Sequence, residues 1–572
     1  MTAAERYQIW CASATEDADL VAELKEMNGN ESEIAERFST DLVFGTGGLR
    51  GVIGAGTSLM NIYTVRRATQ GLADYILKSK PQGASVAIAY DSRIKSELFS
   101  KEAASVMAGN GIHAYIYPEL IPTPMLSFAV RALGAQGGIN VTASHNPSKY
   151  NGYKVYGADG CQLTDDAAGE VFRCIEKVDL FADVKRVDFE QGIAQNLISL
   201  IDESVQESYL EAVQKQSVHQ DVCKKAGLKV IYTPLNGAGN KPVRAILKRI
   251  GVEHVAVVPE QEKPDSNFPT CPYPNPEIRQ VFECGLKMAQ KDEPDLLLAT
   301  DPDSDRVGIA ARDGDDYRLF TGNEVGAMLL NYILSQRAAL GTLPENPIAV
   351  KTIVTTPIVY AIAKKYGCEV VDVLTGFKYI GEKIGELEKS GEEKRYVLGF
   401  EESYGYLAGS YVRDKDAVFA AMMICEMAAF YKLRGKSLVD VIEDIYQEFG
   451  YYSNSVSNFE CSGLAGMQKM QEIMDSLRML VPAEIGGVAV ESVADYFRSE
   501  KTTLATGTKT KIYLPKSNVL SYTMADGANV VVRPSGTEPK IKVYVAASGK
   551  TKNAAETLSK SLLAAITKLM GF

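Results

Sequence analysis

The sequence predicts an α/β protein built from three consecutive α/β domains, with mixed and largely parallel sheets, and a smaller C-terminal α+β domain. Its length of 572 residues is too great for one hydrophobic core, because domains usually hold about 100–200 residues. Short β-branched runs alternate with amphipathic helical stretches through most of the chain, which is typical of parallel sheets joined by helices. The C-terminal region instead places two short strands around a turn before one final helix.

Local patterns predict the individual elements. Residues 1–40 are expected to be helical, because Ala, Glu and Leu recur at helical spacing with few breakers. The expected strands of the alternating region are 85–90, 138–141, 228–232, 295–299, 348–354 and 396–399. The expected elements of the C-terminal region are strands 529–532 and 540–545 and a helix from about residue 552. Changes of pattern divide the chain into domains 1–205, 206–321, 322–455 and 456–572.

Charge and cysteine usage argue against several classes of protein. The net charge of −11, without any basic stripe, predicts that the chain binds neither nucleic acid nor an anionic membrane, because like charges repel. The nine cysteines are dispersed and form no CxxC pair, so we expect reduced thiols rather than disulfides or zinc ligands. The polar N-terminal segment lacks the apolar core of a signal peptide, and no apolar stretch reaches the roughly 18 residues of a membrane span. We therefore expect a cytoplasmic protein.

The segment Thr-Ala-Ser-His-Asn-Pro, residues 142–147, follows the expected strand 138–141 and holds a candidate nucleophile, Ser144. A serine hydroxyl needs a base or a metal to become nucleophilic. His145 is its neighbour, and Lys154 follows closely enough to relay a proton or to neutralise a phosphate. A polar turn closed by Asn-Pro explains the segment equally well. Chemistry alone leaves both interpretations open.

The segment Asp-Pro-Asp-Ser-Asp-Arg follows strand 295–299 and predicts a metal site. In an extended segment Asp301, Asp303 and Asp305 point to one side, where their carboxylates repel unless a cation such as Mg²⁺ or Ca²⁺ lies among them. An EF-hand is excluded, because its sixth and twelfth positions need Gly and Glu where this chain has Arg306 and Arg312. Arg306 adds a cation suited to phosphate. A solvated acidic turn is the less favoured alternative.

Two further segments follow expected strands. Glu401-Glu402-Ser403 offers the carboxylates and hydroxyl that a polyol site needs, although a glycine-bounded turn explains it as well. Residues 533–540, Arg-Pro-Ser-Gly-Thr-Glu-Pro-Lys, combine a guanidinium, two hydroxyls, a glycine and a lysine, which is the inventory of a phosphate cradle. A Pro-Ser-Gly hairpin accounts for the turn but not for the flanking cations.

Together these four segments resemble the α-D-phosphohexomutase family. Its phosphoserine loop (T-[AG]-S-H-N-P), metal loop (D-x-D-x-D), sugar loop (G-E-x-S) and C-terminal phosphate loop (R-x-S-G-T-E-P) occur here in the family order. One departure is Phe400, which stands where the sugar loop usually has Gly. Residues 44–51 resemble the opening G-T-x-G-x-R segment, with Gly47 in place of Ser or Ala. Residues 375–378 and 413–416 resemble further family segments near the substrate.

The resemblance implies a heart-shaped, four-domain intramolecular phosphotransferase that holds one Mg²⁺ per chain. Ser144 would carry the phosphoryl group, glucose 1,6-bisphosphate would be the intermediate and activator, and Lys154 or His145 would be the proton acceptor. The implied catalytic residues are Ser144, His145, Lys154 and Arg50, the implied metal ligands are phosphorylated Ser144, Asp301, Asp303 and Asp305, and Arg306 adds positive charge. The implied substrate-binding residues are Thr375, Gly376, Lys378, Glu401, Ser403, Arg533, Ser535, Gly536 and Thr537.

The sugar specificity is predicted from the same loop. Glu401-Glu402-Ser403 is similar to the version in glucose-directed members, which favours a phosphoglucomutase. The Phe400 start and the chain length are similar to the phosphopentomutase branch, so a phosphopentomutase comes second and a phosphomannomutase third. A metal-dependent sugar phosphatase and a non-catalytic sugar-phosphate binder are alternatives of other classes, and neither explains the full set of loops. The sequence leaves open whether the chain is a monomer or a dimer.

Overall fold

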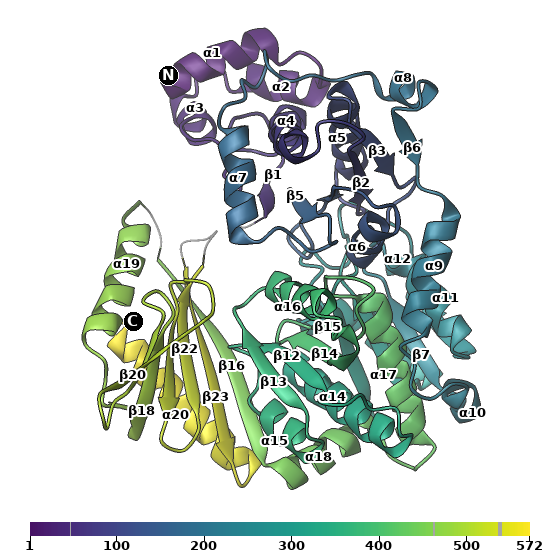
Figure 1. The fold of residues 1–572 in the computed structure, drawn as a ribbon, viewed down its shortest axis with the longest axis vertical. Coiled ribbons are helices and arrows are strands. Elements are labelled where there is room, and N and C mark those ends of the chain that lie inside the picture. The colour runs from purple at the N-terminus through teal and green to yellow at the C-terminus, as the bar shows by residue number, and fades with distance from the viewer. Residues whose placement is uncertain (46, 462–463, 536–539) are drawn as a thin grey trace. The chain divides into compact units, whose positions relative to one another are not determined.

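The computed structural model describes residues 1–45, 47–461, 464–535 and 540–572. The chain forms two units, and Figure 1 labels many of their elements. The first unit comprises residues 1–321, 377–398 and 403–437, and the second unit comprises residues 322–376, 399–402 and 438–572. Each unit therefore contains segments that lie far apart in the sequence.

Three helices open the first unit, and each begins after a polar residue that caps it. They are α1 (Ala3–Ser13), α2 (Ala18–Glu26) and α3 (Glu31–Phe38). The side chains of Thr2, Asp17 and Asn30 accept hydrogen bonds from N–H groups in the first turn of these helices, which the helix itself leaves unsatisfied. Trp10 of α1 packs edge-on against Phe38 of α3 and joins the helices to the core. The expected helical opening is confirmed.

The first sheet has six strands in the order β1-β5-β4-β2-β3-β6. Strands β4, β2, β3 and β6 are parallel, and β5 and β1 add antiparallel pairs at one edge. Its strands are β1 (Gly48–Val52), β2 (Ser85–Tyr90), β3 (His113–Ile116), β4 (Gly137–Val141), β5 (Tyr150–Gly157) and β6 (Ile198–Leu200). Its helices are α4 (Ile62–Ser79), α5 (Ser96–Gly109), α6 (Thr123–Ala132), α7 (Asp165–Ile175) and α8 (Phe189–Ala194).

The second sheet of this unit has the order β11-β10-β9-β7-β8, with β7 parallel to β8 and β9 and with β10 antiparallel to β9 and β11. Its strands are β7 (Lys229–Thr233), β8 (His254–Val257), β9 (Leu296–Thr300), β10 (Val307–Asp313) and β11 (Asp316–Leu319). The neighbouring helices are α9 (Glu203–Gln214), α10 (Val222–Ala226), α11 (Asn240–Arg249), α12 (Pro259–Glu262), η1 (Arg279–Phe282) and α13 (Glu283–Asp292).

The remaining elements of the first unit come from later in the chain. They are α16 (Phe377–Lys389), η2 (Glu393–Arg395), β15 (Gly405–Leu407) and α17 (Ala417–Lys432). Helix α17 packs against α9, α10, α11, β9 and β10. It is apolar on every side and almost wholly buried, as a helix without a polar face must be. Strand β14 (Tyr396–Glu401) begins in the first unit and ends in the second.

The second unit contains the parallel pair β12 and β13 and a large antiparallel sheet. That sheet has the order β16-β23-β22-β21-β18-β19-β20, and β17 pairs with β18. The strands are β12 (Ile348–Thr352), β13 (Glu369–Val373), β16 (Tyr451–Glu460), β17 (Glu484–Ile485), β18 (Val488–Asp495), β19 (Glu500–Thr503), β20 (Thr508–Lys511), β21 (Leu520–Met524), β22 (Asn529–Pro534) and β23 (Lys540–Gly549). The helices are α14 (Gly322–Ala339), α15 (Ile358–Lys365), α18 (Leu438–Phe449), α19 (Leu464–Met479) and α20 (Lys552–Leu569).

The predicted fold class is confirmed: mixed α/β sheets with parallel strands precede a C-terminal antiparallel sheet with helices. The pattern did not predict strands β1 and β5, which are rich in glycine and therefore carry a weak strand signal. Gly48 of β1 is required by close packing, since a β-carbon there would lie 2.2 Å from the carbonyl oxygen of Tyr153. The proposed domain boundaries remain predictions. Within the described residues, no helix has the length and apolar character needed to cross a membrane.

Candidate active site

Three aspartates form a buried cluster in the first unit, between β9 and β10. One carboxylate oxygen from each of Asp301, Asp303 and Asp305 lies within 4.8 Å of the other two. Carboxylates this close repel one another unless a cation lies among them, and oxygen ligands of this kind suit Mg²⁺. The clustering predicted from the sequence is confirmed.

The aspartates converge through a tight turn. The N–H of Ser304, whose φ is 50°, donates to the carbonyl oxygen of Asp301 at 2.8 Å. Asp301 Oδ1 in turn accepts the N–H groups of Asp305 at 3.1 Å and of Arg306 at 2.9 Å. The expected extended segment with alternating side chains is therefore wrong, because the chain reverses here to pair β10 with β9.

The carboxylate oxygens of the cluster have unequal partners. Asp303 Oδ2 accepts a hydrogen bond from Thr123 Oγ1 at 3.0 Å and lies 2.9 Å from Lys154 Nζ. Asp303 Oδ1 and Asp305 Oδ1 are buried and have no hydrogen-bond partner among the described residues. Buried oxygens of this kind normally have a partner, so two of them in one acidic cluster fit a bound divalent cation.

The neighbouring carboxyls of Asp301 and Asp303 have pKa values that are shifted in opposite directions. Burial, together with the charges of Asp303 and Asp305, raises the pKa of Asp301 well above its usual range. Burial acts in the same direction on Asp303, but the ammonium of Lys154 outweighs it, so the pKa of Asp303 is lowered. Asp303 therefore ionises more readily than Asp301.

Ser144 lies directly beside this cluster. It follows β4 with φ 51°, in the left-handed region, and its side chain is buried. Its Oγ donates to Asp301 Oδ2 at 2.7 Å and lies 3.2 Å from His145 Nδ1. The backbone N–H of Ser144 donates to Thr142 Oγ1 at 2.8 Å. The structure thus brings the candidate nucleophile, a candidate base and the metal cluster into contact.

Two cationic side chains lie near this serine. Burial, then the positive charges of Arg306 and Arg50, lower the pKa of His145 well below its usual range, so the imidazole is neutral at pH 7. Arg50 is exposed, and its Nη1 donates to Asn146 Oδ1 at 3.2 Å. Arg306 is held by Glu277, 2.7 Å from its Nη1. Both guanidinium groups are therefore placed at the border of the serine and aspartate loops.

Two lysines neutralise the cluster. Lys154 of β5 contacts Asp303 at 2.9 Å and Asp305 at 3.6 Å. Burial by itself lowers the pKa of Lys154, but these two carboxylates outweigh it and raise the pKa. Lys415, which the sequence placed only in a family-like segment, lies 3.2 Å from Asp305 and 3.1 Å from Asp414. Both ammonium groups are thus directed at the acidic cluster.

Two predicted substrate segments meet in the second unit. Glu401, at the end of β14, is buried, and its Oε1 accepts the backbone N–H of Gly376 at 2.9 Å. Glu402 is half-buried, and its Oε2 accepts longer hydrogen bonds from Thr352 at 3.3 Å and Thr355 at 3.4 Å. The carboxylates of the sugar loop are therefore oriented by neighbouring backbone and hydroxyl groups, as a site that forms hydrogen bonds with sugar hydroxyls requires.

The phosphate loop is described only at its two ends. Arg533 is half-buried at the end of β22, opposite Lys542 of β23. The backbone N–H of Ser535 donates to the carbonyl oxygen of Lys540 at 2.8 Å, which closes the base of the loop. Gly536 and Thr537 lie outside the described residues.

The other predicted substrate residues belong to different elements. Thr375 directly precedes Gly376 in the second unit. In the first unit, Lys378 near the start of α16 is buried, and its Nζ lies 2.6 Å from Asp165. Ser403 is half-buried in the turn between β14 and β15. Lys378 therefore already has an acidic partner, which a substrate phosphate would have to share or displace.

Comparison with known proteins agrees with this arrangement. Four models of the phosphoglucomutase/phosphomannomutase type match in order: α/β/α domain I at residues 41–181, domain II at 207–314, domain III at 321–449, and the C-terminal domain at 479–561. A phosphoglucomutase of Staphylococcus aureus (strain MRSA252) is 38% identical over 527 residues, covering 91% of this chain and 93% of that protein. The chain belongs to the α-D-phosphohexomutase family.

Solved structures of this phosphohexomutase's relatives support the fold. The parafusin phosphoglucomutase of Paramecium, in its open form, has a TM-score of 0.69 at 17% identity and covers 93% of this chain and 96% of its own. A family protein from Burkholderia thailandensis has a TM-score of 0.67 at 17% identity and covers 93% of this chain and 98% of its own. At these identities the likeness supports the fold alone.

Several residues around the phosphohexomutase centre were not predicted from the sequence. Asp91 and Arg93 follow β2, and Thr123 begins α6. Asp91 and Arg93 could have been predicted as site residues, because the segment Asp-Ser-Arg directly follows a strand, as the other site loops do. Thr123 carried no comparable local signal. Lys415 was noted only as part of the family-like segment 413–416, and its place beside Asp305 is set by the fold.

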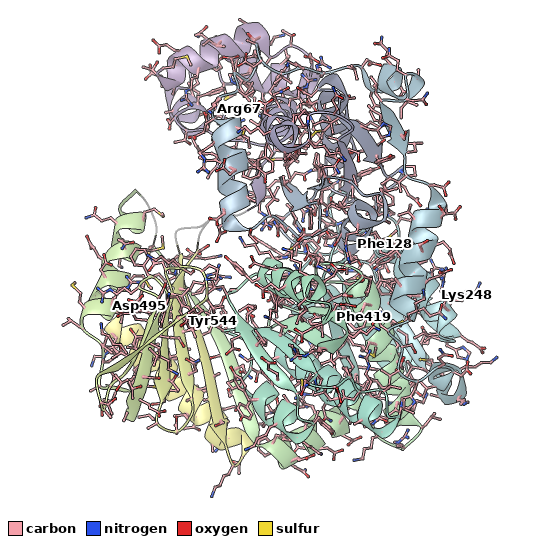
Figure 2. All side chains as sticks on the ribbon, in the orientation of Figure 1. Arg67, Phe128, Lys248, Phe419, Asp495 and Tyr544 are labelled. Carbon is pink, nitrogen blue, oxygen red and sulfur yellow. The ribbon has the colours of Figure 1, made fainter. Side chains whose placement is uncertain are left out.

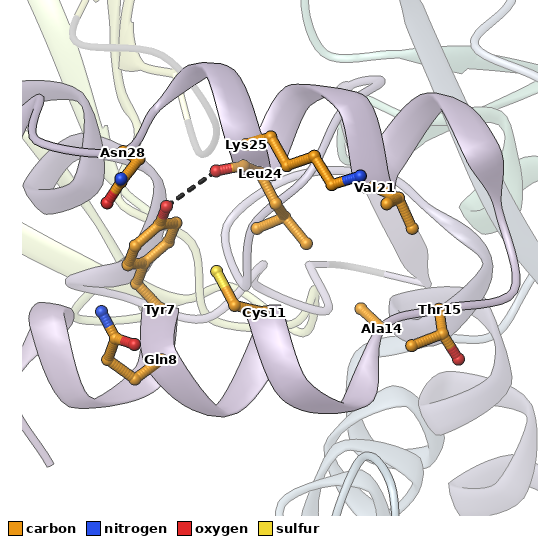
Figure 3. Close-up of a pocket in the computed structure, with 9 residues that line it drawn as sticks. All are labelled: Tyr7, Gln8, Cys11, Ala14, Thr15, Val21, Leu24, Lys25 and Asn28. Atoms are coloured by element: carbon orange, nitrogen blue, oxygen red, sulfur yellow. Dashed lines mark hydrogen bonds between the residues drawn. The ribbon is translucent and has the colours of Figure 1, made fainter.

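A hollow of about 450 Å³ lies between α1 and α2, away from these loops in the sequence. Figure 3 shows its lining, with the hydroxyl of Tyr7 donating to the carbonyl oxygen of Leu24. None of the described residues that line it is a predicted site residue. The catalytic candidates of this phosphohexomutase are instead gathered at the serine and aspartate loops.

Proposed function

We propose that this chain is a phosphoglucomutase that interconverts glucose 1-phosphate and glucose 6-phosphate through a phosphoserine at Ser144. The observation that carries the mechanism is the 2.7 Å hydrogen bond from Ser144 Oγ to Asp301 Oδ2 within the aspartate cluster. The choice of glucose is supported by the 38% identity, over most of the chain, to proteins named phosphoglucomutase. Glucose 1,6-bisphosphate would be the intermediate.

The residues of the first unit would carry out phosphoryl transfer. Asp301, Asp303 and Asp305, with phosphorylated Ser144, would hold one Mg²⁺, which when bound neutralises charge on the transferring group. His145 Nδ1, 3.2 Å from Ser144 Oγ, is placed to accept the serine proton when Ser144 is phosphorylated by the bisphosphate. The proton of the sugar hydroxyl would go to the neutral imidazole of His145, because Lys154, the other predicted acceptor, is an ammonium ion whose pKa is raised by Asp303 and Asp305. Arg50 and Arg306 would add positive charge near the transferred phosphoryl group.

Other residues would bind the substrate away from the reacting atoms. Glu401 and Ser403 would bind sugar hydroxyls, since a carboxylate and a hydroxyl can read a polyol. The proposed phosphate ligands are Arg533, Ser535, Gly536 and Thr537, and further contacts are assigned to Thr375, Gly376 and Lys378. Separate anchors for phosphate and hydroxyl groups would let the bisphosphate bind in two opposite orientations. Either of its phosphates could then react with Ser144.

The proposed compartment and oxidation state follow from the same reasoning. All nine cysteines are free, and eight of them are buried or half-buried. We propose a cytoplasmic enzyme that acts on small sugar phosphates and needs no disulfide.

The decisive assay measures Mg²⁺-dependent conversion of α-glucose 1-phosphate to glucose 6-phosphate, primed with glucose 1,6-bisphosphate. Mannose 1-phosphate and ribose 1-phosphate, each with its own bisphosphate, are compared in parallel. The highest kcat/KM is expected for glucose 1-phosphate. A preference for ribose 1-phosphate would keep the mechanism and overturn the substrate assignment.

The nucleophile is tested by Ser144→Ala. Loss of the phosphoryl acceptor is expected to reduce kcat at least about 10³-fold, because no alternative covalent route replaces it. Ser100→Ala is the matched control, since Ser100 is equally buried and its hydroxyl donates only to a backbone carbonyl within α5. Activity of Ser144→Ala close to that of Ser100→Ala would refute the phosphoserine mechanism.

A further inference from the structure

The serine loop adopts a conformation that needs external support. Ser144 has φ 51°, a region that costs an ordinary L-residue roughly 1–2 kcal/mol. The chain leaves β4 at Val141 and must return to begin β5 at Tyr150, so the loop that holds Ser144 is short. Strain of this kind persists only where the surroundings hold the backbone in place.

Arg93 supplies most of this support. Its Nη2 donates to the carbonyl oxygen of Ser144 at 2.5 Å and, over a shorter distance, to that of Asn146. Its Nη1 donates to the carbonyl oxygens of Pro147 at 3.0 Å and Tyr150 at 3.1 Å. One planar guanidinium thus binds four carbonyl oxygens along the loop, which an ammonium group on a flexible stem cannot reproduce.

Asp91 completes the support from the other side of the loop. Its Oδ2 lies 3.4 Å from Arg93 Nε and accepts the hydroxyl of Thr142 at 2.5 Å. The oxygen of that hydroxyl accepts the backbone N–H of Ser144 at 2.8 Å. The ring of Phe268 covers the guanidinium, with 5.2 Å between Arg93 Cζ and the ring centroid. The N–H and the C=O of Ser144 are therefore both held by one buried network.

We propose that Arg93 is a positioning residue for phosphoryl transfer, whose guanidinium fixes the serine loop so that Ser144 Oγ stays within reach of Asp301. The N–H groups of Arg93 donate to backbone carbonyl oxygens of the serine loop and not to the reacting atoms, so Arg93 would influence phosphoryl transfer by holding this loop in place. The proposal rests on the proposed mutase function for its kinetic consequence, but its structural consequence can be measured without turnover. A loop released by as little as 1 Å is expected to lower the rate about 100-fold.

The rival explanation is that Arg93 is only a buried ion-pair member needed for stability. Arg66 is the matched control for this explanation, because its side chain is also buried and forms ion pairs with Glu16 and Glu102. These ion pairs do not involve the serine loop. The variants to compare are Arg93→Met, Arg93→Lys and Arg66→Met. Arg93→Lys keeps the positive charge and is the variant most able to fold.

The first measurement is amide hydrogen exchange of residues 142–150 in the Mg²⁺-free, unphosphorylated protein. Arg93→Lys is expected to accelerate exchange in this segment at least tenfold, whereas Arg66→Met leaves it unchanged. The second is steady-state kinetics with saturating glucose 1,6-bisphosphate. Both Arg93 variants are expected to lose about 100-fold in kcat with KM within threefold of wild type, while Arg66→Met keeps kcat within threefold.

The outcomes separate the proposal from the proposed function. Unchanged exchange of residues 142–150 in Arg93→Lys, or a kcat loss no larger than that of Arg66→Met, would overturn the positioning role. If the wild-type protein does not turn over glucose 1-phosphate, the proposed function fails, and the exchange experiment alone decides the role of Arg93. If Arg93→Met does not fold, Arg93→Lys carries both measurements.

Discussion

The ring of Phe400 occupies the space that a side chain at Gly326 would need. A β-carbon built on Gly326 of α14 would lie 2.0 Å from Phe400 Cε2 and 2.2 Å from Cδ2. Phe400 is only 1% exposed, so its departure from the usual sugar-loop glycine is a matter of core packing in the second unit. The ring itself is therefore not a surface that a sugar can contact.

Gly326→Ala is expected to destabilise the second unit by about 1–3 kcal/mol, because the added methyl must displace the buried ring. Urea unfolding of the variant measures this loss. The double variant Gly326→Ala, Phe400→Leu should recover part of it, since the smaller side chain makes room. Equal stability of Gly326→Ala and wild type would show that the ring moves without cost.

Thr123→Val is expected to weaken Mg²⁺ binding about 10-fold or more, because Thr123 Oγ1 donates to Asp303 Oδ2 at 3.0 Å and orients that carboxylate. Titration of activity with Mg²⁺ and calorimetry of the metal alone both measure the affinity. Thr69→Val is the control, since Thr69 is as buried but bonds Tyr153 and the backbone of α4. A Mg²⁺ affinity equal in the two variants would contradict the orienting role.

Removal of the metal with a chelator is expected to abolish mutase activity, and Mg²⁺ should restore it. Mg²⁺ should also raise the midpoint of thermal unfolding, because a ligand that binds only the folded state stabilises it by mass action, by about 2.7 kcal/mol at 100 times Kd. Asp305→Asn should lose this shift, whereas Asp313→Asn, an exposed position at the end of β10, should keep it. A shift that survives in Asp305→Asn would place the metal elsewhere.

Asp416 provides a prediction about pH. It is buried, caps α17 through the N–H of Phe419, and accepts the hydroxyls of Tyr209 and Tyr411. Phe128, which packs on Tyr209, and Phe419 are labelled in Figure 2. Burial raises the pKa of Asp416 from 3.8 to about 6. The folded state therefore binds the proton more tightly than the unfolded state between these two values.

The stabilisation from this proton is present at low pH and is lost as the pH rises through about 6. Relative to Asp416→Asn, which cannot titrate, wild type is expected to gain about 1 kcal/mol of unfolding free energy between pH 7 and pH 5. Urea unfolding of both proteins at the two pH values measures the difference. A gap between the proteins that does not change with pH would rule out titration of Asp416 in this range.

The chemistry of the site was largely predictable, because each loop carries its reactive groups within a few residues. Ser144 and His145 are adjacent, and the three aspartates alternate over five positions. Strand β2 was predicted to the residue, since Val86 and Ile88 lie in a short apolar run that ends before Asp91. The glycine-rich strands β1 and β5 were missed because their stability comes from cross-strand pairing rather than from local preference.

Residue types at short spacing were enough to predict the fold class, the candidate nucleophile, the candidate metal ligands and the family resemblance. The groups from distant parts of the chain that contact the aspartates and the serine loop became known only from the tertiary structure. Thr123 and Lys154 come to Asp303 from α6 and β5, and Arg93 reaches the serine loop from the end of β2. Contacts between segments many residues apart depend on how strands are ordered in a sheet, and no local pattern encodes that order.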